Sequence, residues 1–141
     1  MTTPFYSNKC LVGGGIQARA PLALCSVSAV YNISATLLTA DVIHMITMPA
    51  GSTVVDLLLD AGDMDAGSQL TLSVGYTGAL TAFINASTIG RAGGVARLSV
   101  VGGTLKTFAA EDTIQVSATA GAQTADTSGA IKLTVYYTMD A

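Results

Sequence analysis

Hydrophobic and polar residues alternate with a period of two along several short blocks of the chain. In the last block the odd-numbered positions are apolar: Ile131, Leu133, Val135 and Tyr137. The even-numbered positions between them are mainly polar, and Tyr136 is one of them. Because successive side chains of a β-strand point to opposite faces of a sheet, the odd positions are predicted to face the core and Tyr136 to point outward.

The same alternation predicts which side chains of other blocks face the core. They are Val55, Leu57 and Leu59, then Leu70, Leu72 and Val74, and finally Ile114, Val116 and Ala118. In the first of these blocks Leu58 is an apolar residue between Asp56 and Asp60, on the side predicted to be polar. We therefore expect Leu58 to contact a neighbouring subunit.

Turn-forming residues separate these blocks, and the pattern predicts eight strands. The strands are Ser26–Ile33, Asp41–Met48, Ser52–Leu59, Gln69–Gly75, Val95–Val100, Thr104–Phe108, Thr113–Thr119 and Ala130–Met139. The chain contains one Glu and three Lys, so it lacks the residues that usually cover exposed helices. The predicted fold is all-β, a single jelly-roll-like antiparallel β-sandwich.

The first 24 residues show no sustained alternation and are predicted to form an extended N-terminal arm before a β-sandwich domain of residues 25–141. The arm contains two of the three prolines and the triple glycine Gly13–Gly15. We expect contacts with a sister subunit or a larger assembly through Phe5, Tyr6, Lys9, Leu11, Val12, Ile16 and Arg19 of the arm, and through Leu58 and Tyr136 of the sandwich. The alternative is an arm that folds back on its own sandwich as an edge strand.

Composition excludes several classes of function. The chain has 141 residues, with six Lys plus Arg, nine Asp plus Glu and a net charge of −3. So few basic residues cannot neutralise a phosphate backbone, and no nucleic-acid partner is expected. Half of the residues are hydrophobic, yet no run approaches the roughly 18–20 apolar residues that span a bilayer, so no membrane partner is expected. The apolar excess favours a homo-oligomer.

Reactive side chains are few and form no recognisable catalytic set. His44 is the only histidine, and its apolar neighbours predict a packed or interfacial side chain rather than a general base. One His and two Cys fall short of the four ligands of a structural zinc site. Cys10 and Cys25 are expected to be reduced, because no export signal is recognised. No enzyme activity and no cofactor are therefore expected.

Asp60, Asp63 and Asp65 form the densest acidic cluster and are the only candidate ligands for a cation. Their spacing differs from that of an EF-hand loop, which is closed by a bidentate Glu at its twelfth position. The alternative interpretation is a turn in which the Asp side chains accept hydrogen bonds from nearby backbone N–H groups.

Three stretches carry a resemblance to a known family. They are ADVIHMITMPAGSTVVDLLLDAGDMDAGSQLTLSVGY, STIGRAGGVARLSV and AAEDTIQVSATAGAQTADTSGAIKLTVYYTMD, from about Asp41 to Asp140. They contain an apolar strand, a Pro-Ala-Gly turn, a Val-Val-Asp strand, an Asp-rich loop and a terminal Leu-Thr-Val-Tyr-Tyr strand. This order resembles the auxiliary head proteins of tailed bacteriophages, which are called decoration or cement proteins.

The resemblance implies a β-rich structural virion protein on the exterior of a capsid. Such a protein is made in the host cytoplasm, binds the major capsid protein, clamps neighbouring capsid subunits and is expected to be a trimer. A phage tail or fibre subunit, or an adhesin, remains an alternative with the same Thr, Gly and Ala content. A carbohydrate-binding module is less favoured, because the chain has no Trp, five Tyr and three Phe to form a sugar platform.

Overall fold

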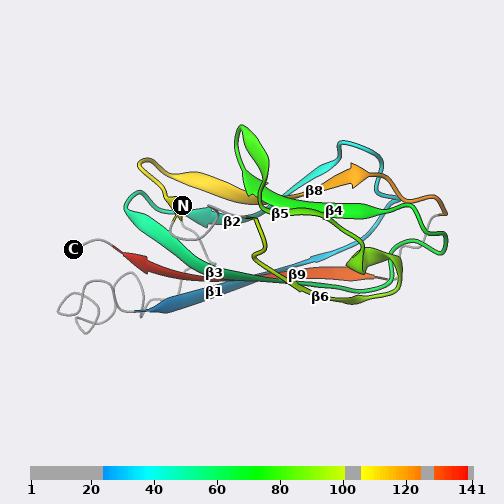
Figure 1. Cartoon of the computed structure of the whole chain (residues 1–141), viewed down its shortest axis with the longest axis horizontal. Coiled ribbons are helices and arrows are strands. Elements are labelled where there is room, and N and C mark those ends of the chain that lie inside the picture. Colours follow the sequence, from blue (N-terminus) through cyan, green and yellow to red (C-terminus); the bar gives the residue numbers. More distant parts are fainter. Residues whose placement is uncertain (1–23, 101–105, 125–128, 140–141) are drawn as a thin grey trace.

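Two antiparallel β-sheets lie face to face in this protein, as the two layers of strands in Figure 1 show. The structure is a computed structural model that describes residues 24–100, 106–124 and 129–139. Within these ranges the only helical element is one 3-10 turn, η2 (Ile89–Arg91). The all-β sandwich predicted from the alternation is confirmed.

Each sheet has a simple strand order. Sheet A has the order β1-β9-β3-β6, and a short strand β7 also pairs with β3. Its strands are β1 (Cys25–Asn32), β3 (Ser52–Ala61), β6 (Gly94–Arg97), β7 (Lys106–Thr107) and β9 (Ala130–Met139). Sheet B has the order β2-β8-β4-β5. Its strands are β2 (Val42–Met48), β4 (Thr71–Tyr76), β5 (Ala79–Ser87) and β8 (Asp112–Ala120).

The connections between the strands are those of a jelly roll. The chain changes sheet between β1 and β2, between β2 and β3, and between β3 and β4. It then makes the β4–β5 hairpin within sheet B, returns to sheet A for β6 and β7, and changes sheet again before β8 and before β9. Eight strands arranged as two Greek keys define this fold, and the two-residue β7 is an addition to it.

The core lies between the two sheets, where the alternation predicted it. Eight of the predicted inward side chains have no exposed surface: Leu57, Leu59, Leu70, Leu72, Val74, Ile114, Val116 and Ile131. The same is true of Leu133, Val135 and Tyr137 in β9. The alternation with a period of two therefore predicted correctly which residues of β4, β8 and β9 face the core.

Strand β3 departs from the prediction at Val55. Its pairing with β9 shifts register between Val54 and Asp56, so that Val54 and Leu57 both face the core. Such a β-bulge places an extra residue in one strand and moves the following side chains to the opposite face. Val55 is half-buried and lines a groove on the outer side of the sheet. Its predicted inward orientation is wrong.

A second bulge changes the position of His44. The pairing of β2 with β8 shifts between His44 and Ile46, and Met45 and Ile46 are both buried as a result. His44 is exposed, and its Nδ1 atom lies 3.1 Å from the Oγ1 atom of Thr113. His44 is therefore not packed within its own sandwich, whereas the other predicted alternative, an interfacial histidine, stays a prediction.

The predicted strand list has one omission and several wrong bounds. Strand β5 (Ala79–Ser87) was not predicted, because its sequence ALTAFINAS does not alternate cleanly. The strand predicted over Val95–Val100 ends at Arg97. Strand β3 is longer than predicted and continues to Ala61.

Candidate functional site

Only two of the residues predicted to contact another protein belong to the described part of the chain. They are Leu58 in β3 and Tyr136 in β9. The others lie outside the described residues: Phe5, Tyr6, Lys9, Leu11, Val12, Ile16 and Arg19. Cys10 lies outside them as well, while Cys25 is buried at the start of β1.

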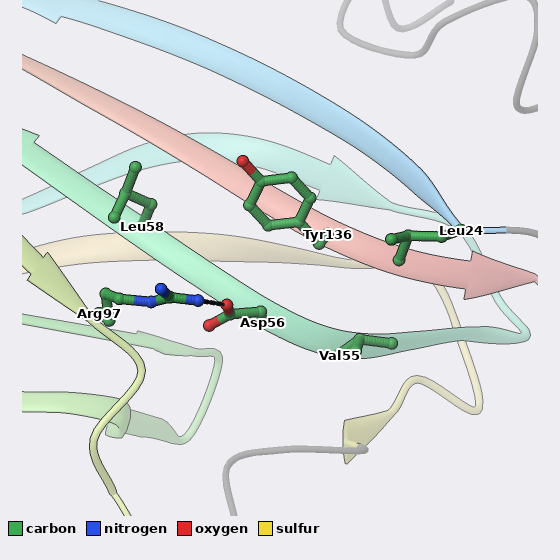
Figure 2. A pocket seen from close by; sticks show the side chains of 6 residues that line it. All are labelled: Leu24, Val55, Asp56, Leu58, Arg97 and Tyr136. Atoms are coloured by element: carbon green, nitrogen blue, oxygen red, sulfur yellow. Dashed lines mark hydrogen bonds and ion pairs between the residues drawn. The ribbon is translucent and has the colours of Figure 1, made fainter.

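Leu58 and Tyr136 lie together in one groove on the outer face of sheet A, which Figure 2 shows. We call this the sheet A groove, and its volume is about 390 Å³. The six residues that line it are Leu24, Val55, Asp56, Leu58, Arg97 and Tyr136. The alternation predicted that each of these two residues points outward. The structure shows, in addition, that both line the same groove.

Sheet register explains why these residues meet. Tyr136 is paired with Asp56, and Leu58 is paired with Arg97 of β6 on its other side. The bulge in β3 brings Val55 to the outer face beside Asp56, where a regular strand would have turned it inward. The groove therefore depends on the irregularity that the sequence pattern did not reveal.

An ion pair borders the groove. The Arg97 guanidinium donates to Oδ2 of Asp56, and the backbone N–H of Leu57 donates to Oδ1 of the same carboxylate at 2.8 Å. The side chain of Arg97 is 69% exposed and that of Asp56 is 28% exposed. A pair this accessible to solvent contributes at most about 1 kcal/mol to folding. Its position beside four apolar side chains gives the groove both an apolar floor and a charged border.

More apolar surface surrounds the groove on the same face of sheet A. Leu24 is 65% exposed and belongs to the groove itself. Val30 is 60% exposed and is paired with Lys132, and Val95 is 56% exposed and is paired with Asp60. Exposed apolar residues that gather on one face mark interaction sites more often than scattered ones.

Asp65 is the one acidic residue of the Asp-rich loop that is fully buried. Its carboxylate accepts five backbone N–H hydrogen bonds, all between 2.8 and 3.1 Å, from Gly67, Gln69, Leu70, Gln123 and Thr124. The donors come from the loop before β4 and from the loop after β8. Asp65 therefore joins two connections that are far apart in the sequence.

The environment of Asp65 also sets its protonation. Burial alone would raise the pKa of this carboxyl, but the backbone hydrogen bonds to the charged form outweigh burial and hold the pKa well below its usual range. The donors responsible are the N–H groups of Thr124, Leu70, Gln123 and Gln69. Both carboxylate oxygens are thus already used by the backbone.

The candidate cation site is not formed by the acidic cluster. Asp60 and Asp63 are exposed, and Oδ1 of Asp63 accepts a hydrogen bond from the backbone N–H of Asp65 at 3.3 Å. Within the described ranges, no three His, Cys, Asp or Glu side chains lie close enough together to hold a metal ion. The structure therefore agrees with the alternative interpretation, in which Asp63 and Asp65 accept bonds from backbone N–H groups.

Residues 24–100, 106–124 and 129–139 include no helix with the length and apolar character needed to cross a membrane.

Sequence reasoning missed four residues of the groove, namely Leu24, Val55, Asp56 and Arg97. The opposite charges of Asp56 and Arg97 on neighbouring outward positions were the one signal that could have pointed to part of it.

Comparisons with known proteins concern the fold. No protein-family model matches the chain, and no curated protein matches it. A chain in the cyanophage Pam1 capsid asymmetric unit is similar with a TM-score of 0.76 and 22% identity, over 99% of this chain and 92% of that one. A chain in the capsid of Ralstonia phage GP4 has a TM-score of 0.75 and 22% identity, over 86% of this chain and 87% of that one.

A third similar chain belongs to the acid-stable capsid structure of the Helicobacter pylori bacteriophage KHP30. Its TM-score is 0.62 and its identity is 15%, over 86% of this chain and 91% of that one. At these identities the likeness establishes a shared fold. All three solved structures are phage capsids.

Proposed function

We propose that this protein is a structural component of a tailed-phage virion that binds the exterior of the capsid. In this proposal it forms a homo-oligomer, a trimer, and stabilises the shell by clamping neighbouring major capsid subunits. The observation that carries the proposal is the likeness to a chain of the Pam1 capsid over nearly the full length of both chains. The matched chain is therefore of similar length.

The fold suits this role physically. A clamp needs a rigid body with complementary surfaces and no reactive groups, and two packed sheets supply the rigid body. Many copies on one shell let a weak single contact act through multivalency. The proposal therefore includes no catalytic activity, no cofactor and no nucleic-acid contact.

Contact residues follow from the surface and from the sequence. The sheet A groove, with Leu58 and Tyr136, is a candidate contact surface within the sandwich. Phe5, Tyr6, Lys9, Leu11, Val12, Ile16 and Arg19 of the predicted N-terminal arm remain the other proposed contacts.

Electron cryomicroscopy of particles of the phage that encodes this chain tests the proposal directly. We expect a jelly-roll density on the outer surface of the head, in symmetry-related groups of three that bridge capsid subunits. Density in the tail or fibres would instead support the alternative function, and absence of the chain from particles would reject both.

A second experiment tests the clamp itself. Particles made without the chain are heated beside particles that carry it, and head rupture is followed by light scattering. We expect rupture at a lower temperature without the chain, and recovery when the purified protein is added back. Equal rupture temperatures would contradict a stabilising role.

A further inference from the structure

We infer that the sheet A groove binds the segment before Leu24 (residues 1–23) of a neighbouring copy of this chain. This inference deepens the homo-oligomer of the proposed function and rests on it. It assigns the surface and the segment through which the copies bind one another.

The groove has the properties of a site for an apolar segment. The groove is lined by four apolar or aromatic side chains, of which Leu24 is exposed and Val55, Leu58 and Tyr136 are half-buried. Burial of apolar surface contributes roughly 25 cal/mol per Å², so a covering segment stabilises such a groove. The Asp56–Arg97 pair at its border adds hydrogen-bonding groups that a peptide backbone can use.

The segment before Leu24 has the matching chemistry. It carries the apolar side chains Phe5, Tyr6, Leu11, Val12 and Ile16. A segment of 23 residues reaches up to roughly 75 Å when extended, which is enough to reach a neighbouring copy. It joins the sandwich at Leu24, which itself lines the groove, so each groove lies beside the point from which a segment departs.

Chain direction favours a neighbouring copy over the same copy. Ser26 is paired with Tyr136, and Ser28 is paired with Thr134, which is paired in turn with Leu58. The groove thus extends from Leu24 in the direction in which β1 runs, whereas a chain that continues β1 backward leads away from it. Contacts of one copy's segment with the next copy's groove are head-to-tail contacts, which form a ring such as a trimer where the rotation between copies closes.

Photo-crosslinking with isotope-mixed chains tests this inference. The substitution Tyr136→p-benzoylphenylalanine places a photoreactive aromatic side chain in the groove. Leu38→p-benzoylphenylalanine is the control, because Leu38 is 61% exposed in the loop between β1 and β2 and lies outside the groove. Unlabelled and ¹⁵N-labelled full chains are mixed in equal amounts in denaturant, so that both enter the same oligomers, and are refolded together at about 100 μM. They are then irradiated and cleaved with trypsin after Lys9 and Arg19.

We expect the Tyr136 variant, and not the Leu38 variant, to form mixed light–heavy crosslinks to the peptides 1–9 or 10–19. Crosslinks only within one isotope population would show that the segment binds its own groove, and would overturn the inference. Crosslinks to other peptides, or none, would overturn it as well. The location of the protein on particles is measured separately, so either result can fail without the other.

Light scattering provides a second readout. We expect Leu58→Ser to weaken self-association at least about tenfold, whereas Leu38→Ser, in the loop between β1 and β2, leaves it unchanged. Deletion of residues 2–23 should give a folded monomer, with circular dichroism as the check on folding. Self-association of Leu58→Ser with the affinity of the unmodified chain would contradict the inference.

Discussion

The outer faces of the two sheets differ in how far the protein covers them itself. On sheet A, Leu24, Val30 and Val95 are each more than half exposed. On sheet B, Ser73, Gln115 and Ser117 occupy outward positions between core residues, yet all three are buried. The chain itself therefore covers these polar side chains of sheet B, whereas it leaves the three apolar side chains on sheet A exposed.

Strand β5 provides the cover on sheet B. Between the pairs Val74–Ile84 and Tyr76–Ala79, β5 contains three more residues than β4. A Cβ atom at Gly75 would clash with the carbonyl oxygen of Ala79, so this part of β5 passes directly over the glycine. Extra residues in one strand of a pair bend that strand out of the sheet.

Hydrogen bonds complete the outer face of sheet B. Nε2 of Gln115 donates to Oγ1 of Thr77 at 3.1 Å and to Oγ1 of Thr113 at 2.9 Å. The hydroxyl of Thr77 donates in turn to Asp112 at 2.7 Å. These polar side chains therefore have hydrogen-bond partners within the chain, as buried polar groups generally do.

The largest expected effect comes from removing the space that β5 needs. We expect Gly75→Ala to destabilise the fold by at least about 3 kcal/mol, because the added methyl group meets backbone atoms that cannot move independently. Gly78→Ala is the matched control. It meets no atom within 4 Å, but its φ of +83° should still cost about 1–2 kcal/mol. Equal losses in urea unfolding would show that β5 does not lie tightly over sheet B.

A change at Asp65 should affect both sheets, since the loops that it joins connect one sheet to the other. In Asp65→Asn an NH₂ group faces backbone N–H donors in place of a carboxylate oxygen. We expect the melting temperature to fall by roughly 10 °C. Asp63→Asn, which alters an exposed carboxylate, should lower it by no more than about 2 °C. Similar melting temperatures for the two variants would contradict the central role of Asp65.

The same carboxylate predicts a pH dependence. The pKa of Asp65 is lower in the folded than in the unfolded state, so its contribution to stability is complete above the unfolded value of about 3.9. The contribution decreases as the pH falls from there toward the folded pKa. Thermal unfolding between pH 6 and pH 2 should therefore show a steeper loss for the unmodified chain than for Asp65→Asn. Parallel curves would refute this assignment.

A pair of serines compares the two outer faces most directly. Ser73 on sheet B is hydrogen-bonded to the Thr119 hydroxyl and accepts from the backbone N–H of Ala86 at 2.9 Å. Ser28 on sheet A is exposed, and its hydroxyl lies 2.9 Å from that of Thr134. We expect Ser73→Ala to cost about 1–3 kcal/mol and Ser28→Ala less than about 0.5 kcal/mol. Equal costs in denaturant unfolding would mean that the two faces are equally solvated.

Local pattern predicted the parts of the fold that follow regular geometry. In β9 no bulge interrupts the alternation, so Ile131 to Tyr137 could be assigned to their faces from the sequence. In β3 and β2 one extra residue shifts the register, and neither Val55 nor His44 carries a local signal of it. The groove could not be predicted, because it requires both the bulge and the neighbour relation between β3 and β6.

Asp65 shows a different limit. The sequence drew attention to three acidic residues in one loop, but their chemistry depends on donors that are remote in the chain. Two of the five N–H groups belong to Gln123 and Thr124, and no local spacing identifies them as partners of Asp65 rather than of Asp60 or Asp63.

The place of β9 in sheet A has a consequence for the order of folding. β9 is the last strand of the sandwich to be synthesised, yet it lies between β1 and β3 and pairs Cys25 with Tyr137. During synthesis, sheet A therefore cannot form until β9 has emerged from the ribosome. Until then β1 and β3 lack β9, the strand that lies between them and pairs with both. Pairings this distant in sequence close slowly, in milliseconds to seconds. A chain that is cut before β9 is expected to aggregate rather than to fold into a smaller sandwich.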